Sequence, residues 1–460
     1  RGGVLTEDKF KNPFSEQSER IITNRYVGEL SYKTTFEDSS NLEVGGAYVR
    51  HKRNATNDAY LTDYTSIHQT SPPVSDLAPY LADEHTFSGI AMYNKNMGSH
   101  HLLAGMQFSN SDFNESGKYL VLDEDSDHYG TSFSSVSNKL FSDYGVFVQD
   151  EISISSDLQI VPGIRYDYYT ARETYTSEGG AINQFPRVTY QTSSVNPRLA
   201  IKYDFSRRFS LRFSTGSGFR PPAEFSEDLH LCSGSPRIWK SSRLNPERAV
   251  SFNLSTDYYG EQVRLGASIF RTNLYNKIDF IGAKPNIRAK GYNYQWENIG
   301  DAYVQGLELS WRSELTEDLN VNGNFTVNQG IYKYAREEWQ DSDYEEESRH
   351  ISKFPLHSGH LGLQYSPGSW NFSLDATYKG PMYIDYYQDE SIPTKIKKTK
   401  PYVFYDAKIS RSIRSITLYV RVENITDYVQ PEKHLDDAAF IYAPLIGRMY
   451  HAGIKLKLKH

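Results

Sequence analysis

The sequence predicts an all-β protein, a transmembrane antiparallel up-and-down β-barrel, and three observations support that prediction. Apolar and polar residues alternate with a period of two along most of the chain, which is typical of strands with two unlike faces. The connections between these stretches are short and long in turn. The 460 residues are 14% aromatic although only 38% are hydrophobic and the mean hydropathy is −0.62. Disordered chains are poor in aromatic residues, so a chain of this composition folds.

The alternating stretches follow one another from the N-terminal to the C-terminal side, and each sets apolar side chains against polar ones. The clearest case sets Ile416, Leu418, Val420 and Val422 against Thr417, Tyr419, Arg421 and Glu423. Other apolar sets, in chain order, are Tyr26, Leu30 and Tyr32; Leu42, Val44 and Tyr48; Leu102, Ala104, Met106 and Phe108; Tyr144, Val146 and Val148; Leu158, Ile160, Ile164, Tyr166 and Tyr168; Leu199, Ile201, Tyr203 and Phe205; Phe209, Leu211 and Phe213; Val250, Phe252 and Leu254; Val263, Leu265, Ala267 and Ile269; Leu307, Leu309 and Trp311; Leu319, Val321, Phe325 and Val327; and Ile454, Leu456 and Leu458. No helix of ordinary length is expected.

The connections predict where the two rims of the barrel lie. Tight turns are expected at Glu37–Ser40, Lys95–Ser99, Ser155–Asp157, Ser206–Arg208, Tyr259–Gln262, Thr316–Asp318, Ser366–Ser369 and Ser412–Ser415. Long polar segments are expected at about 51–84, 110–141, 171–194, 215–248, 274–301, 330–355, 380–401 and 425–446. In an up-and-down barrel the short turns share one rim and the long loops share the other. Outer-membrane barrels have this asymmetry, with short periplasmic turns and long external loops.

Soluble β-sandwiches and propellers are the alternatives. Sandwich strands are usually about 5–6 residues long, shorter than the runs in this chain. Propellers repeat a motif every ~40–50 residues, and none recurs. No apolar run reaches the ~20 residues of a transmembrane helix. A barrel explains the low hydropathy, because its apolar face meets lipid and its polar face meets the lumen.

The turns also give a strand count. Eight tight turns join sixteen strands, and a last strand from about Ile446 makes about 17. An odd number cannot close an all-antiparallel ring, so residues 1–460 are expected to form one barrel domain that is incomplete on its N-terminal side.

Several short motifs occur in the order of a known family. Phe219, Arg220, Pro221 and Pro222 are followed by Leu244, Asn245, Pro246 and Glu247, and these two boxes resemble the paired FRAP and LxPE boxes of TonB-dependent outer-membrane receptors. The wider string GFRPPAEFSEDLH is similar to the cobalamin- and siderophore-type receptors of Bacteroidetes. The segments YGVFVQDEISI with VPGIRYDYY, ENIGDAYVQGLELSW, VRVENITDY and IGRMYHAGIKL are similar to further marks of the family.

The resemblance implies a ~22-stranded barrel with a plugged lumen in the outer membrane of a Gram-negative bacterium. It implies uptake of a metal chelate, namely cobalamin, a ferric siderophore or haem, driven by TonB with ExbB and ExbD through a plug domain that this sequence lacks. A surface lipoprotein is a further implied partner. The alternative is a passive porin or a structural barrel in a larger assembly. No nucleic-acid partner is expected, since the net charge is −7 and no basic patch occurs.

Candidate ligand-binding residues lie in the long segments. The family resemblance makes His230 a candidate haem-iron ligand, and the alternative is a loop histidine without that role. Arg237 and Arg243 could meet an anionic siderophore. Aromatic side chains give flat apolar contact with a polar tip, which is the reason for naming Tyr292, Tyr294, Trp296, Tyr383, Tyr386 and Tyr387. These tyrosines could instead belong to the interfacial aromatic girdle.

No permanently bound cofactor is expected, and the metal remains unknown. The acidic clusters could hold Ca²⁺, which takes ~6–8 oxygen ligands, or could be solvated loop tips. They comprise Asp123, Glu124, Asp125 and Asp127, and Asp341, Asp343, Glu345, Glu346 and Glu347. The single cysteine excludes an internal disulfide. No catalytic motif of a hydrolase, metalloprotease or nucleotide-binding enzyme occurs, so the protein is not expected to be an enzyme.

Overall fold

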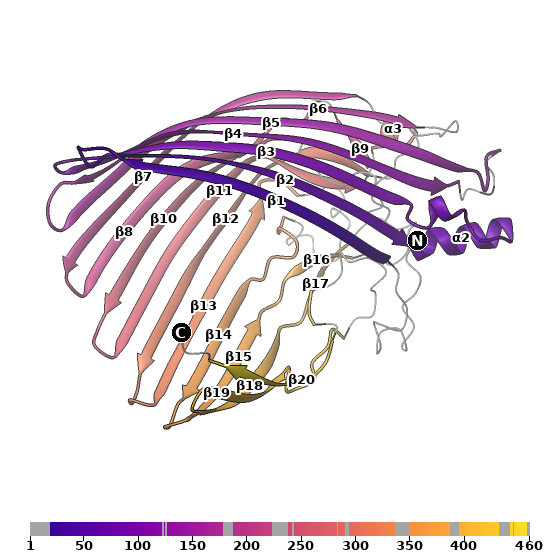
Figure 1. The fold of residues 1–460 in the computed structure, drawn as a ribbon. Coiled ribbons are helices and arrows are strands. Elements are labelled where there is room, and N and C mark those ends of the chain that lie inside the picture. The colour runs from indigo at the N-terminus through magenta and orange to yellow at the C-terminus, as the bar shows by residue number, and fades with distance from the viewer. Residues whose placement is uncertain are drawn as a thin grey trace.

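The computed structural model gives the fold of most of the chain (Figure 1). The described residues are 19–121, 124, 127–177, 187–222, 238–241, 243–282, 284–289, 294–335, 349–386, 395–431, 442–444 and 446–457. In this part, one 18-stranded sheet curves around a central axis, and a two-stranded sheet lies beside one end.

Seventeen strands of the large sheet are antiparallel to their neighbours and follow the chain in order, with β9 as the one parallel addition. They are β1 (Glu19–Thr35), β2 (Asn41–Asn57), β3 (Tyr80–Met97), β4 (His100–Leu120), β5 (Ser132–Ser153), β6 (Leu158–Ser177), β7 (Val188–Ser206), β8 (Phe209–Arg220), β10 (Glu247–Tyr259), β11 (Val263–Gly282), β12 (Tyr294–Glu314), β13 (Leu319–Tyr332), β14 (His357–Tyr365), β15 (Trp370–Lys379), β18 (Tyr402–Ile413), β19 (Ile416–Glu423) and β20 (Met449–Leu456). The predicted all-β fold with about 17 strands is confirmed.

Smaller elements occur in the long connections. They are α2 (Asp58–His68), the 3₁₀ turn η1 (Val74–Asp76), β9 (Ile238–Lys240), α3 (Pro285–Arg288), and the pair β16 (Tyr383–Tyr386) and β17 (Lys395–Lys398). No helix in the described ranges is long and apolar enough to cross a membrane.

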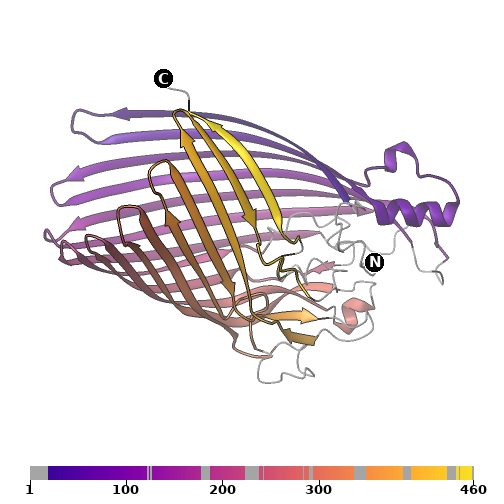
Figure 2. The same ribbon diagram turned by 90° about the horizontal axis from the view of Figure 1, so that it is seen from below.

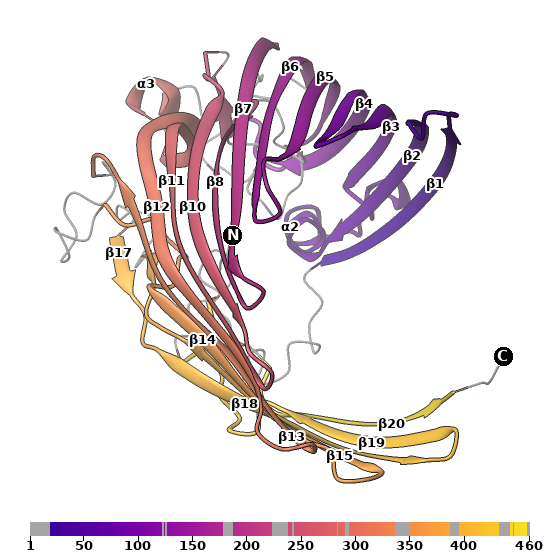
Figure 3. The same cartoon turned by 90° about the vertical axis from the view of Figure 1, so that its left-hand side faces the viewer.

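The two ends of the sheet differ as the connections predict. All eight predicted tight turns join neighbouring strands, for example Thr316–Asp318 between β12 and β13. Figures 1 and 2 show these turns together at one end, while α2, α3 and β16 lie at the other. We call the two ends the turn end and the loop end. Seen along the axis, β1 and β20 are the two edges of an open arc (Figure 3), and no pairing joins them among the described strands.

The strand faces also follow the predicted alternation. Leu30, Tyr32 and Ile454 point outward and are 80%, 65% and 70% exposed, whereas the inward Lys139 and Glu173 are fully buried. Contact with water is unfavourable for the exposed apolar side chains on the convex face, so this face is suited to contact with the hydrocarbon of a membrane. The inner face carries hydroxyl, amide and charged groups.

Two predictions about the long segments are wrong in detail. The strands run further into the segments expected to be loops, because pairing continues where the outward residues are no longer apolar, as in Asn114 opposite Asn138. The expectation of no helix of ordinary length is also wrong, since α2 has 11 residues. Its aromatic residues recur every fourth position, with ring centroids 6.2 Å apart for Tyr60 and Tyr64 and 4.4 Å apart for Tyr64 and His68. This helical spacing was the missed signal.

Candidate functional site

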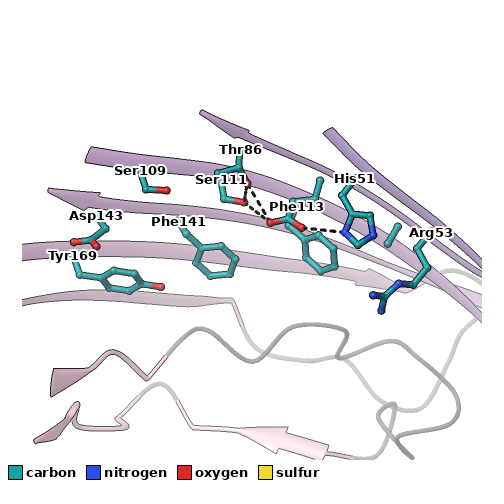
Figure 4. Close-up of a pocket in the computed structure, with 11 residues that line it drawn as sticks. His51, Arg53, Thr86, Ser109, Ser111, Phe113, Phe141, Asp143 and Tyr169 are labelled. Carbon is teal, nitrogen blue, oxygen red and sulfur yellow. Dashed lines mark hydrogen bonds and ion pairs between the residues drawn. The ribbon is translucent and has the colours of Figure 1, made fainter. Parts of the chain in front are cut away.

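A cavity of about 450 Å³ opens on the inner face of β2 to β6, near the loop end (Figure 4). Its lining comprises His51, Arg53, Ala82, Glu84, Thr86, Ser109, Ser111, Phe113, Phe141, Asp143 and Tyr169. We call it the wall pocket. Every lining residue comes from an inward-facing position of one of five consecutive strands, so the register of the sheet alone brings them together.

Glu84 is the best-fixed polar group of the wall pocket. Its Oε1 accepts hydrogen bonds from Thr86 Oγ1 at 3.2 Å and from Ser111 Oγ at 3.1 Å. His51 Nδ1 lies 3.8 Å from Glu84 Oε2. The carboxylate is therefore held in place by donors from two strands, and its second oxygen lies next to the His51 imidazole.

Aromatic rings form the other half of the wall pocket. Phe113, Phe141 and Tyr169 stand on β4, β5 and β6, and Lys139 Nζ lies 5.2 Å from the Phe113 ring centroid. Rings beside a guanidinium, an imidazole and two carboxylates give an amphipathic surface. Such a surface can hold a flat, polar-edged molecule through ring contact and orient it through the charged groups.

Segments from the long connections pack onto this wall from inside. Ile287 of α3 is buried in a cluster with Tyr80 and Phe113, and Trp239 of β9 packs against it. Beside the cluster, Lys139 Nζ lies 2.7 Å from Glu115 Oε1, and both side chains are fully buried. A buried ion pair is tolerated only when its remaining polar atoms are also satisfied. Tyr80 Oη contributes here by donating to Glu115 Oε2 at 3.2 Å.

The two sequence boxes meet in space at the loop end of β8 and β10. Arg220 lies opposite Glu247 in the register, with Arg220 Nε 2.7 Å from Glu247 Oε2. The other carboxylate oxygen accepts the backbone N–H of Ile278 on β11 at 2.5 Å. Pro221 and Pro222 are buried directly after the strand.

The rest of the second box fastens β10 to β12. Asn298 Oδ1 accepts the backbone N–H of Asn245 at 2.8 Å, and its Nδ2 donates to the carbonyls of Asn245 and Asn276 at 3.0 and 2.7 Å. Leu244 is buried in an apolar cluster that Phe219 joins from its edge. We call this set the box junction. It anchors both ends of the long excursion between β8 and β10, and Pro246 is half-buried within it.

Three of the predicted ligand residues, Arg243, Trp296 and Tyr383, have described side chains, and none of them lines the wall pocket. Arg243 is exposed and its backbone N–H bonds Ser241 Oγ at 3.1 Å. Trp296 packs at the edge of the apolar cluster that contains Leu244. Tyr383 is only 2% exposed, and its ring stacks on His350 with centroids 4.3 Å apart.

For Tyr294 and Tyr386 the structure describes only the backbone, at the start of β12 and the end of β16. His230, Arg237, Tyr292 and Tyr387 lie outside the described residues. So do all the acidic-cluster residues apart from Glu124 and Asp127, which are exposed between β4 and β5. Among the residues with described positions, no group of three or more metal-ligating side chains converges. The ligand and Ca²⁺ assignments therefore stay predictions.

The wall pocket itself was not predicted, although the sequence contains a signal for it. Phe113, Phe141 and Tyr169 occupy the polar-face parity of their strands, opposite in phase to Phe108 and Tyr144. Aromatic residues on a face that otherwise carries polar groups, near the long connections, indicate an inward aromatic surface.

Comparison with known proteins gives consistent results. The family model described as "TonB dependent receptor-like, beta-barrel" matches residues 3–425. The ferric enterobactin receptor of Pseudomonas aeruginosa is 24% identical over 212 residues, which cover 42% of this chain and 25% of that protein. The probable TonB-dependent siderophore receptor PiuA of Acinetobacter baumannii is 20% identical over 298 residues, which cover 61% of this chain and 36% of that protein.

Solved structures show the same fold. The copper transporter OprC superposes with a TM-score of 0.70 at 15% identity, covering 96% of this chain and 66% of that one. The unliganded ferric citrate transporter FecA gives a TM-score of 0.67 at 16% identity, covering 95% of this chain and 62% of that one. The chain thus spans about two thirds of the length of these solved chains, and its matches span a quarter to about a third of the curated relatives.

Proposed function

Because this chain belongs to the TonB-dependent receptor-like β-barrel family, we propose that it forms the barrel of an outer-membrane receptor of a Gram-negative bacterium that imports a ferric siderophore. The observation that carries the proposal is the wall pocket, an aromatic and charged surface on the inner face of the barrel wall near the loop end. A chelate captured by the external loops would meet this surface as it enters the lumen.

The siderophore class rests on chemistry and on the relatives together. Catecholate chelates present flat rings and negative charge, and the wall pocket offers Phe113, Phe141 and Tyr169 beside Arg53. Two curated relatives carry the names of siderophore receptors. Cobalamin and haem remain candidate ligands, with haem depending on His230.

Transport would draw its energy from TonB with ExbB and ExbD through a plug domain, as in the family. A surface lipoprotein could assist capture at the loop end. The alternative of a passive porin fits less well, because Ile287 and Trp239 pack against the inside of the wall and take up space that an open pore would need.

Growth of a deletion strain tests the proposal. The strain would be grown with ferric enterobactin, ferric citrate or haemin as the sole iron source, and on limiting cyanocobalamin. We expect growth to fail on a ferric siderophore alone and to return when the full-length gene is supplied. Loss of growth on haemin or cyanocobalamin alone would reassign the ligand. Normal growth on every source would reject chelate uptake.

A further inference from the structure

The outward face of β10 to β13 changes character within one row of residues. Leu254, Ile269, Leu307 and Val327 lie side by side across these four strands, and each is 39–53% exposed. The next outward row toward the loop end is Phe252, Arg271, Gln305 and Gln329. On β11 to β13 the strands therefore pass from an apolar row to a row of hydrogen-bonding groups over one step of two residues, about 7 Å, while β10 keeps an apolar residue, Phe252.

Arg271 is held rigidly in the second row. Its guanidinium carbon lies 4.4 Å from the Tyr303 ring centroid. Its Nε donates to Asn273 Oδ1 at 3.0 Å, and its Nη1 donates to Gln305 Oε1 at 3.0 Å. Gln305 in turn donates to Gln329 Oε1 at 2.8 Å. The ring and the neutral amides fix the guanidinium without balancing its charge.

No carboxylate of the described residues lies within ion-pair distance of Arg271. Asp301, two positions beyond Tyr303 on β12, is 3.8 Å from Lys333 Nζ and accepts the backbone N–H of Asn276 at 3.3 Å. Arg248, also exposed on the outward face, adds a second positive charge two rows closer to the loop end. The outward rim of β10 to β13 therefore carries unbalanced positive charge directly beside its apolar band.

Arg50 provides a contrast on the same face and near the same end. Its Nε and Nη2 donate to the two oxygens of Asp83 at 3.1 and 2.8 Å. That guanidinium is already occupied by a carboxylate in the two-pronged geometry that a phosphate would use. Arg271 has the same guanidinium group, but no carboxylate of the described residues is paired with it.

We propose that Arg271, set on Tyr303 and its amide neighbours, binds the phosphate of a membrane lipid. Guanidinium groups match phosphate oxygens in geometry and charge, and a cation at the edge of a hydrocarbon band lies at the depth of lipid head groups. The acyl chains of such a lipid would lie along Leu254, Ile269 and Leu307. This inference rests on the membrane location in the proposed function, but it does not depend on which chelate is imported.

Lipid binding to the full-length protein in detergent tests the proposal. Native mass spectrometry would compare phosphatidic acid with diacylglycerol, which has the same acyl chains without the phosphate. We expect the wild type to retain phosphatidic acid about fivefold more strongly, a typical gain for one basic residue at a membrane surface. The ratio should fall toward one in Arg271→Gln and stay unchanged in Arg50→Gln, the matched control.

A second variant keeps the test decisive if Arg271→Gln folds poorly. Gln305→Glu is nearly isosteric and places a carboxylate against Arg271, so it should also abolish the preference, and heat-modifiable gel migration would report folding. An unchanged preference in a folded variant would overturn the proposal. Displacement of the lipid by inorganic phosphate at equal concentration would overturn the lipid assignment in favour of a free-anion site. Failed chelate uptake with intact phosphatidic acid selectivity would reject only the proposed substrate.

Discussion

Arg220 and Glu247 close the loop ends of β8 and β10 against each other, with Arg220 Nε 2.7 Å from Glu247 Oε2. The second oxygen of the same carboxylate accepts the Ile278 backbone N–H, so one side chain fastens three strands. Glu247 is mostly buried while Arg220 is half-exposed. The carboxylate, and not the guanidinium, is therefore the centre of the box junction.

Replacing Glu247 by glutamine tests this role. The amide keeps one acceptor oxygen but presents N–H groups to Arg220, so we expect the free energy of unfolding to fall by about 1–3 kcal/mol. Urea-induced unfolding in detergent micelles, followed by tryptophan fluorescence, would measure it. Glu261→Gln is the matched control, because its 2.7 Å pair with Arg208 is exposed and should change stability by less than about 0.5 kcal/mol. Equal effects of the two variants would contradict the assignment.

Gly323 gives a second prediction, because Trp311 covers it from the neighbouring strand. A Cβ on Gly323 would lie 2.3 Å from Trp311 Cζ2, so the indole must move. We expect Gly323→Ala to destabilise the barrel by about 1–3 kcal/mol in the same unfolding assay. The cost should largely vanish in a Trp311→Ala background. Gly28→Ala is the control, since its Cβ would meet nothing within 4 Å. A cost that persists without the indole would place its cause in the backbone.

Much of this architecture could be predicted because membrane barrels repeat one simple pattern. The side facing hydrocarbon must be apolar and the strands must turn back, so alternation and turn residues locate elements such as Ile416–Glu423 and the turn Ser412–Ser415. These signals are local. The alternation of apolar and polar residues disappears beyond the apolar band, where the outward residues are also polar. For this reason the loop-end halves of β4 and β5 were expected to be loops.

The site was harder to predict because it depends on register between distant segments. Glu84, Ser111 and Phe113 become neighbours only through the pairing of β3 with β4. Arg220 and Glu247 stood out as motif residues, but no sequence pattern indicates that Glu247 also accepts a hydrogen bond from the backbone of Ile278. Tyr383 was named as a ligand residue for being aromatic in a long segment, and the structure buries it against Ala302 and Tyr332.

The Asp76 carboxylate is expected to hold residues 58–79, the segment that contains α2, in a pH-dependent way. Burial raises the pKa of this carboxyl, but hydrogen bonds from Lys118 and Ser75 outweigh burial and hold the pKa below its ordinary value. A depressed folded-state pKa contributes stability that is fully present above the unfolded value of 3.8 and is lost as the pH falls through the folded value. Asp76→Asn should therefore loosen residues 58–79 at neutral pH.

Hydrogen exchange at matched pH would measure the effect of Asp76→Asn. Peptides from residues 58–79 should exchange faster in the variant at pH 7, and the difference from wild type should shrink once the pH drops below 4. Asp63→Asn, on α2 itself, should leave exchange unchanged, since no hydrogen bond or ion pair involves the Asp63 side chain in the described part of the protein. A difference that persists at low pH would show that charge on Asp76 is not what holds the segment.

Substitutions of Arg53 and Glu84 should affect chelate binding differently, because these two residues line the wall pocket with opposite charges. Ferric catecholate chelates are anionic, so Arg53→Gln should weaken their binding about tenfold, the loss expected when a hydrogen bond to a charged group is removed. Glu84→Gln removes a repulsive charge and should leave binding unchanged or strengthen it. Arg50→Gln, three positions from Arg53 but on the outward face, should have no effect. Fluorescence quenching by ferric enterobactin would measure all three in the full-length receptor. Equal losses in Arg53→Gln and Arg50→Gln would show that the wall pocket does not bind the chelate.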